Sequence, residues 1–332
     1  MSAPSAEVAP PSMPEAPMPS IQPGGGWCMQ LELLWGRWRR WWLKRLRPAY
    51  VRQMQAKRLG TCNDCPGRVQ GCCGDVIDTR DLKYFRNVCG YAFAPADDGF
   101  QHRDRWPLAR WGLGEMVIAT LLSVGLNVGI GLLMWAGLPA WIGYLASLLV
   151  LLGWLFILNF FRDPERSIPT DPDVLVSPAD GQVTHVEEVA DAEFPGGRAL
   201  RISIFLSVFN VHVNRAPRTA RIERIRYFPG EYFNAMKAIS AVKNEQLWID
   251  LKDEQLQCPL RIKQIAGAIA RRIVSPLKVG EIMHIGQRIG MIKIGSRTEV
   301  FLPTDVGAEP IVKVGDMVKG GSSVLLRFKK AG

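Results

Sequence analysis

Residues 289–303 read IGMIKIGSRTEVFLP, and this stretch decides how the rest of the chain is interpreted. Two apolar runs flank Gly295, Ser296 and Arg297, which predicts two strands joined by a tight turn with a small nucleophile at its tip. The glycine leaves the peptide bond before Ser296 sterically open and permits backbone angles that other residues rarely adopt. A Gly-Ser pair is common in turns, so its meaning depends on the surrounding sequence.

From residue 162 onward, short apolar runs alternate with Gly and Pro, and helical patterns are few. This pattern predicts a mostly β (α+β) domain of short antiparallel strands over residues 162–332, large enough for a core of its own. We expect residues 199–214 to form one long strand. Residues 233–242 and 265–274 have the best helical spacing and are expected to be helices.

The segment before this domain is apolar throughout. Residues 116–161 contain no charged side chain, a length that fits two membrane-spanning helices of roughly 20 residues each. Residues 136–139 (AGLP) predict the turn of a transmembrane hairpin over residues 113–161. Arginines flank both ends of the hairpin and none lies in the turn. By the positive-inside rule, the domain that follows is expected on the cytoplasmic face of the inner membrane.

The N-terminal region begins with two segments of contrasting composition. Residues 1–26 hold seven prolines and predict a disordered tail. Residues 27–59 carry nine Lys/Arg against one acid, with Trp and Leu at helical spacing between the cations. They predict a basic, Trp-rich amphipathic helix on an anionic bilayer, with a solvated helix that covers another domain as the alternative. Because the net charge of +10 is mostly local, we expect no nucleic-acid partner.

Residues 60–112 form a cysteine-containing module. Cys62 and Cys65 have zinc-ligand spacing, and Cys72 and Cys73 follow after six intervening residues, so a zinc or iron–sulfur site is one interpretation. The spacing matches no regular finger, and two adjacent cysteines fit poorly around one tetrahedral ion. Reduced thiols in a small loop-rich module are the alternative, in keeping with a reducing compartment.

Three polar residues of the β domain have the types of a serine nucleophile, its base and a group that orients the base. His212 lies in a predicted strand with Asn210 and Asn214 on the same face. Asp180 lies in the turn SPADG. Together with Ser296 they suggest a Ser–His–Asp set. Taken singly, a core histidine and a turn aspartate are the simpler interpretation.

Seven ordered motifs lie between residues 160 and 303. They are residues 160–166 (FFRDPER), 177–181 (SPADG), 210–217 (NVHVNRAP), 227–235 (YFPGEYFNA), 244–245 (NE), 264–274 (QIAGAIARRIV) and 295–303 (GSRTEVFLP). In this order the chain resembles the phosphatidylserine decarboxylase proenzyme family in its short form. The resemblance covers about residues 110–332 and leaves residues 1–109 without a match.

The resemblance implies a self-processing, pyruvoyl-dependent enzyme that converts phosphatidylserine to phosphatidylethanolamine at the cytoplasmic membrane face. In that family the serine of the GS motif attacks the preceding carbonyl, and the chain splits between Gly295 and Ser296. The products would be associated chains of 295 and 37 residues. The pyruvoyl group derived from Ser296 would form a Schiff base with the substrate amine and act as an electron sink for loss of CO2.

The resemblance also implies roles for individual residues. His212 would be the base and Asp180 its orienter. Longer family members have a second histidine where this chain has Arg215, so either His212 serves both steps or Arg215 binds the lipid phosphate or the serine carboxylate. The substrate pocket is expected to include, by motif match, Tyr232, Phe233, Asn234, Asn244 and Glu245. We also expect a homo-oligomer.

Two other functions are left open by the sequence. Residues 312–324 have a Val-x-x-Gly rhythm similar to that of lipoyl carriers and membrane-fusion adaptors, which would make the protein an uncleaved, membrane-tethered scaffold. Alternatively, the same pyruvoyl chemistry would act on a related serine phospholipid, such as an archaetidylserine-type lipid. Chain size on a denaturing gel tests the first, and substrate assays test the second.

Overall fold

The computed structural model describes residues 106–329, except for 229, 238, 269–271, 278–279 and 294, and six residues between 41 and 49. The predicted tail and most of the cysteine module, with Cys62, Cys65, Cys72 and Cys73, lie outside the described residues. So does most of the predicted amphipathic helix, of which the six described residues are helical and exposed.

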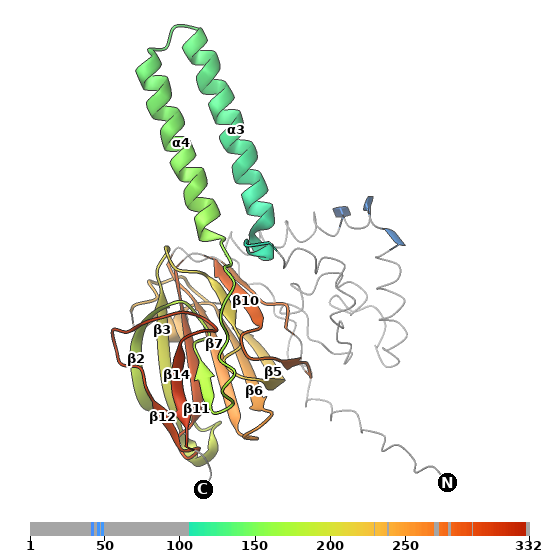
Figure 1. The fold of residues 1–332 in the computed structure, drawn as a ribbon, viewed down its shortest axis with the longest axis vertical. Coiled ribbons are helices and arrows are strands. Elements are labelled where there is room, and N and C mark those ends of the chain that lie inside the picture. The colour runs from blue at the N-terminus through green and yellow to red at the C-terminus, as the bar shows by residue number, and fades with distance from the viewer. Residues whose placement is uncertain are drawn as a thin grey trace.

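Two long antiparallel helices precede the β domain and extend away from it (Figure 1). A short 3-10 helix, η5 (Arg110–Gly112), leads into α3 (Leu113–Trp135), and α4 (Ala140–Phe160) returns the chain to the β domain. Gly137, with a φ of 110°, lies in the turn between the helices, where a positive φ favours glycine. Their apolar side chains are largely exposed, so these are not core helices of a globular domain. The predicted helical hairpin is confirmed.

The β domain consists of three sheets. The largest has the strand order β13-β2-β3-β11-β7-β6-β5-β9, and the two smaller ones have the orders β1-β14-β12 and β4-β10-β8. The strands are β1 (Val174–Val176), β2 (Gly181–Ala190), β3 (Arg198–Leu206), β4 (Val213–Arg215), β5 (Ala220–Phe228), β6 (Gln246–Asp253), β7 (Pro259–Ala266), β8 (Arg272–Val274), β9 (Ile282–Met283), β10 (Arg288–Lys293), β11 (Ser296–Pro303), β12 (Ala308–Pro310), β13 (Met317–Val318) and β14 (Val324–Phe328). All the ladders between these strands are antiparallel, which confirms the mostly β prediction.

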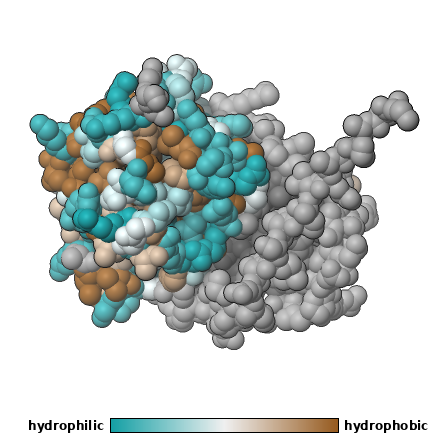
Figure 2. Space-filling view, turned by 90° about the horizontal axis from the view of Figure 1, so that it is seen from below, coloured by the Kyte–Doolittle hydropathy of each residue, from teal (hydrophilic) through white to brown (hydrophobic). Residues whose placement is uncertain are grey.

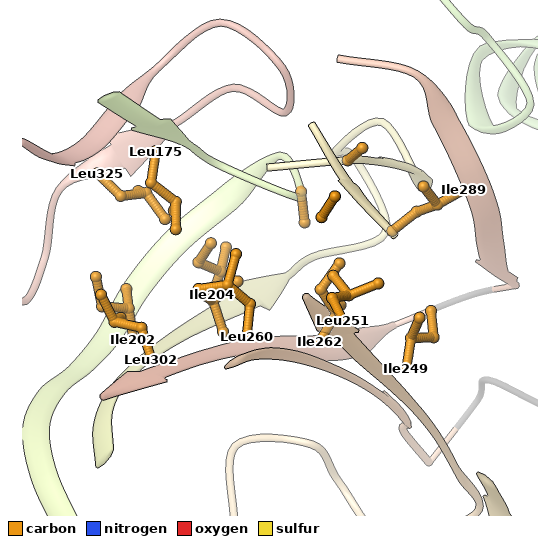
Figure 3. Close-up of a cluster of buried hydrophobic side chains, with 14 of the residues drawn as sticks. Leu175, Ile202, Ile204, Ile249, Leu251, Leu260, Ile262, Ile289, Leu302 and Leu325 are labelled. Carbon is orange, nitrogen blue, oxygen red and sulfur yellow. The ribbon is translucent and has the colours of Figure 1, made fainter. Parts of the chain in front are cut away.

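The hydrophobic core lies between the large sheet and the small ones. Figure 3 shows Ile202, Ile204 and Leu302 of the large sheet below Leu175 and Leu325 of β1 and β14. All five side chains are fully buried. Alternate residues of each strand point into this layer, which explains why the short strands carry apolar residues at every second position.

The stretch 289–303 is not the predicted hairpin. β10, which ends at Lys293, pairs with β4 and β8, whereas β11, which begins at Ser296, pairs with β3 and β7, so the two strands belong to different sheets. Gly295 permits this change of sheet because its φ of 59° lies in the left-handed region. Ser296 is therefore the first residue of a central, wholly buried strand and does not lie at a turn tip.

Two other local predictions were wrong, and a third, the helix over 233–242, was right only at its end. Residues 199–214 are interrupted after β3, because the Asn210 side chain accepts hydrogen bonds from the Ser207 backbone N–H at 2.8 Å and from its hydroxyl at 2.7 Å, which forms a loop. Residues 265–274 include the end of β7 and all of β8. Of the described residues in the predicted helix 233–242, only those from Ser240 onward are helical, where α5 (Ser240–Lys243) begins. Short apolar runs do not distinguish a helix from a buried strand, and sheet pairing decided the outcome.

Candidate active site

The Gly295–Ser296 bond lies at the end of the large sheet that faces the helices. Ser296 pairs with Leu206, the last residue of β3, and with Ala266, the last residue of β7. β6 begins beside the same end of β7, where Gln246 pairs with Ile265. The loops 207–212 and 229–245, which adjoin these strand ends, therefore lie at the same end of the sheet.

Ser296 is fully buried, and its Oγ has no hydrogen-bond partner within the described part of the chain. A buried hydroxyl is normally paired, so an unpaired one at this position suggests a functional constraint. The carbonyl before it rests against Gly267. A Cβ at Gly267 would lie 2.3 Å from the Gly295 oxygen, so only glycine fits there. The Gly295–Ser296 bond thus has the unpaired Ser296 hydroxyl on one side and the close contact between Gly267 and the Gly295 carbonyl on the other.

The imidazole of His212 reaches the same peptide. Its Nε2 accepts a hydrogen bond from the Gly295 N–H at 3.3 Å, and its Nδ1 lies 2.9 Å from the Asn210 carbonyl oxygen. Because a carbonyl only accepts, Nδ1 carries the proton and Nε2 keeps its lone pair. Burial lowers the pKa of His212 to about 4, against the opposing effect of the Asn210 hydrogen bond. The ring is therefore neutral near pH 7 and able to take a proton.

The base of the helical hairpin forms one wall around this histidine. Phe160, the last residue of α4, lies with its ring centroid 4.3 Å from that of His212. It belongs to a buried apolar cluster that also contains Trp111 and, from the loop 207–212, Val211. This apolar wall keeps water from the imidazole, which is the physical origin of its lowered pKa.

Asp180 does not take the predicted position beside His212. Its two carboxylate oxygens accept hydrogen bonds from Arg166 at 2.9 and 2.7 Å, and one also accepts from the Gly320 N–H at 2.7 Å. The Nδ1 of His212, which an orienting carboxylate would contact, faces the Asn210 carbonyl. Asp180 instead joins the segment after α4 to the chain between β13 and β14.

Arg215 is also occupied within the protein. It is buried and donates to Asp163 at 2.7 Å, to the Gly286 carbonyl at 3.1 Å and to the Pro164 carbonyl at 3.3 Å. Arg288 pairs with the other oxygen of Asp163. These contacts fix the segment after the helices to β4 and β10. A guanidinium held in this way supports the fold, and the geometry does not present it to a lipid.

Asn244 holds the loop that contains the predicted pocket residues. It accepts from the Phe233 N–H at 2.8 Å and donates to the carbonyls of Phe233 at 2.8 Å and Ala266 at 2.6 Å. Asn234 accepts from the Met236 N–H at 2.9 Å. The loop is thus fastened to the residue of β7 that pairs with Ser296.

Glu245 is buried next to Asn244 and receives two hydroxyls. Tyr227 and Tyr232 each donate to one of its carboxylate oxygens at 3.0 Å. Tyr227 lies in β5 and Tyr232 in the loop, so the carboxylate joins the loop to the sheet. The structure therefore brings Tyr232, Phe233, Asn244 and Glu245 together as one bonded unit.

The sequence reasoning missed a polar patch beside Ser296. Thr298 shares the Ser296 face of β11 and pairs with Gln264 of β7, whose Nε2 donates to the Asn214 oxygen at 2.7 Å. Thr298 Oγ1, Gln264 Oε1 and Asn214 Nδ2 are buried and have no partner among the described residues. Such atoms indicate a place for water or for a polar group of a ligand. The sequence did carry a sign of this patch, because Gln264 and Thr298 are polar residues at positions of β7 and β11 that face inward.

No metal centre is found in the part of the chain that the structure describes, where no three His, Cys, Asp or Glu side chains are grouped to hold an ion. The proposed ligands Cys62, Cys65, Cys72 and Cys73 lie outside that part.

Comparison with known proteins gives consistent matches. The profile of the phosphatidylserine decarboxylase family matches residues 154–326. The chain is 40% identical over 255 residues to a phosphatidylserine decarboxylase proenzyme of Rhodopirellula baltica, covering 75% of this chain and 100% of that protein. It is 45% identical over 219 residues to the proenzyme of Carboxydothermus hydrogenoformans, covering 66% and 94%. With the Solidesulfovibrio magneticus proenzyme it shares 37% over 243 residues, covering 73% and 98%.

These matches define the class of protein first: the chain is an enzyme, a carboxy-lyase of phospholipid biosynthesis. It belongs to the phosphatidylserine decarboxylase family, and the resemblance inferred from its seven sequence motifs is confirmed.

Proposed function

We propose that this chain is the precursor of a pyruvoyl-dependent decarboxylase that cleaves itself between Gly295 and Ser296. One observation carries the proposal: a neutral histidine contacts the Gly295 amide, and the buried hydroxyl of the next residue has no partner among the described residues. A neutral histidine that contacts the adjoining amide supports a role as the base that activates this serine for attack on the peptide bond before it, once Nε2 turns from the Gly295 N–H to the hydroxyl.

The cleavage can be written from these groups. Ser296 Oγ forms a bond to the Gly295 carbonyl carbon as the C–N bond breaks, and the Oγ proton passes to His212 Nε2 and then to the released amine. His212, having given up that proton, takes the Ser296 α-proton as the Cβ–Oγ bond breaks, which leaves a carboxylate on Gly295 and a dehydroalanine. Hydrolysis of the dehydroalanine releases ammonia and leaves a pyruvoyl group at the start of the 37-residue chain.

The two chains would stay together after cleavage because the short chain supplies internal strands. β11 pairs with β3 and β7, β13 with β2, and β14 with β1, so strands on both sides of the cut share ladders. Val300 and Leu302 of β11 are buried in the common core. Separation would expose that core, which is strongly unfavourable.

We infer that phosphatidylserine is the substrate, as the names of the relatives indicate. A pyruvoyl carbonyl supplies an electron sink for loss of CO2. The neutral side chains of Asn214, Gln264 and Thr298 are candidates to hold the polar headgroup. Being neutral, they would bind the serine carboxylate less tightly than a Lys or Arg side chain would. His212 is positioned to hold a proton for return to the decarboxylated carbon.

We propose that α3 and α4 span the inner membrane, with the β domain on the cytoplasmic side. Their lengths of 23 and 21 residues, apolar composition and low burial support this setting. A tail over 1–26, an interfacial helix over 27–59, a cysteine module over 60–112 and a homo-oligomeric assembly remain predictions.

The test is the intact mass of the purified membrane protein, compared with that of a Ser296→Ala variant. We expect wild-type protein to give a 295-residue chain and a 37-residue chain blocked to Edman degradation, with the variant intact. Decarboxylation of phosphatidylserine should follow the cleaved form alone. Folded wild-type protein that stays a single chain would overturn the proposal and favour an uncleaved scaffold.

A further inference from the structure

We propose that residues 232–243 form a second membrane-contact segment, distinct from the helical hairpin, that lies on the anionic lipid surface beside the Gly295–Ser296 bond. The inference rests on the proposed function, because it concerns how a lipid reaches that bond.

This segment exposes apolar side chains that a segment facing water would normally bury. Met236, Ile239 and Val242 are 60%, 41% and 79% exposed, whereas Ser240 and Asn244 are buried. The exposed apolar residues recur every third position and so share one face of the turns that end in α5. Three exposed apolar side chains gathered on one face fit an apolar medium around that face.

The charge of the segment suits an anionic surface. The sequence has no acidic residue between Glu231 and Glu245, and Lys237 and Lys243 are both exposed among the apolar side chains. Lysines beside inserted apolar residues can extend their ammonium groups to phosphates at the headgroup level. This favours an anionic bilayer over a second protein as the occupant.

The inner face of the segment packs against the scissile peptide. Arg297, the residue after Ser296, donates to the carbonyl of Ala235 and, at 3.3 Å, to that of Lys237. A Cβ at Gly267 would meet both the Gly295 oxygen and, at 3.2 Å, the Ala235 Cβ. The segment therefore separates the Gly295–Ser296 bond from the lipid surface that we propose for its outer face.

The segment also lies at the end of the β domain from which the helices extend. Loop residue Phe209 is 66% exposed, and its ring packs edge to face against Phe156 of α4 at 6.1 Å between centroids. Arg162, just after α4, donates to the Phe209 carbonyl at 2.6 Å. Figure 1 shows the helices leaving this end, and Figure 2 shows that polar and apolar side chains are interspersed at the opposite end. The proposed surface is thus continuous with the membrane-facing side.

A direct test places a benzophenone amino acid at Val242 in the full-length, processed protein, reconstituted in vesicles of phosphatidylglycerol and phosphatidylcholine. The matched control is Ile282 of β9, which is 38% exposed and pairs at the opposite end of β5. We expect a lipid adduct by mass at position 242 and none at 282. Absence of a lipid adduct at 242, or an adduct with a second copy of the chain in its place, would overturn the proposal.

A functional test compares Val242→Glu with Ile282→Glu. A carboxylate placed against lipid is unfavourable, so the first variant should turn over vesicle-borne phosphatidylserine roughly tenfold more slowly. The Val242 variant should cleave itself on a gel as wild type does, and it should decarboxylate dispersed short-chain phosphatidylserine at the wild-type rate. The Ile282 variant should match wild type in self-cleavage and on both forms of the lipid. A wild-type rate of Val242→Glu on vesicles counts against the segment. Wild-type protein that neither cleaves itself nor decarboxylates the dispersed lipid counts against the proposed function instead.

Discussion

Replacement of Gly267 by alanine should slow self-cleavage strongly while leaving the protein folded. The added methyl group would meet the Gly295 oxygen at 2.3 Å, the Gly295 carbonyl carbon at 3.0 Å and the Ala235 Cβ at 3.2 Å. Two of these neighbours are backbone atoms of the scissile peptide, which cannot move aside by a change of rotamer. The perturbation therefore acts on the carbonyl that Ser296 must attack.

The size of the effect follows from this distance. A carbon and an oxygen in ordinary close contact lie roughly 3.3 Å apart, so the carbonyl must shift by about 1 Å. A displacement of that size at a reacting centre costs on the order of 100-fold in rate. Overpacking of this kind also destabilises a fold by about 1–3 kcal/mol. Processing should thus suffer far more than folding.

The assay is a time course of chain cleavage on a denaturing gel, with thermal unfolding measured in parallel. Gly153→Ala is the matched control, because a Cβ at Gly153 in α4 meets nothing within 4 Å. Ser296→Ala gives the uncleaved limit. Cleavage of Gly267→Ala at the Gly153→Ala rate would refute the argument that the scissile carbonyl rests on residue 267.

Three further predictions concern the histidine and the loop. Because the pKa of His212 is about 4, its basic form is lost only as the pH falls toward 4. Gel time courses should therefore show a level cleavage rate from pH 8 to about 5 and a decline below that. A midpoint of the decline near pH 6.5 would contradict this prediction. Phe160→Leu should admit water to the His212 ring and move that midpoint upward, whereas Phe156→Leu, at a ring that packs against Phe209, should leave it unchanged. Asn244→Ala removes three hydrogen bonds and should lower stability by about 3 kcal/mol, seen as a fall in Tm of roughly 10 °C; an unchanged Tm would refute its role in holding the loop.

Features that depend on neighbours in the chain were predictable from the sequence. The charge-free run of residues 116–161 predicted both helices and the turn between them, and the short apolar runs after residue 162 predicted a mostly β domain. The motifs around Gly295 and His212 identified the family, because residue types at close spacing carry that information.

Features that depend on the choice of distant partners required the tertiary structure. The two apolar runs of residues 289–303 join different sheets, since each finds a better partner far along the chain than the other run offers. His212 and Gly295 meet across 83 residues, and a backbone carbonyl, which has no signature in the sequence, takes the place predicted for Asp180. The sequence by itself determined the helical hairpin, the mostly β class of the domain that follows it and the residue types that can react. Only packing, a competition among many alternative long-range contacts, decided that Ser296 begins a central strand against Gly267 and His212.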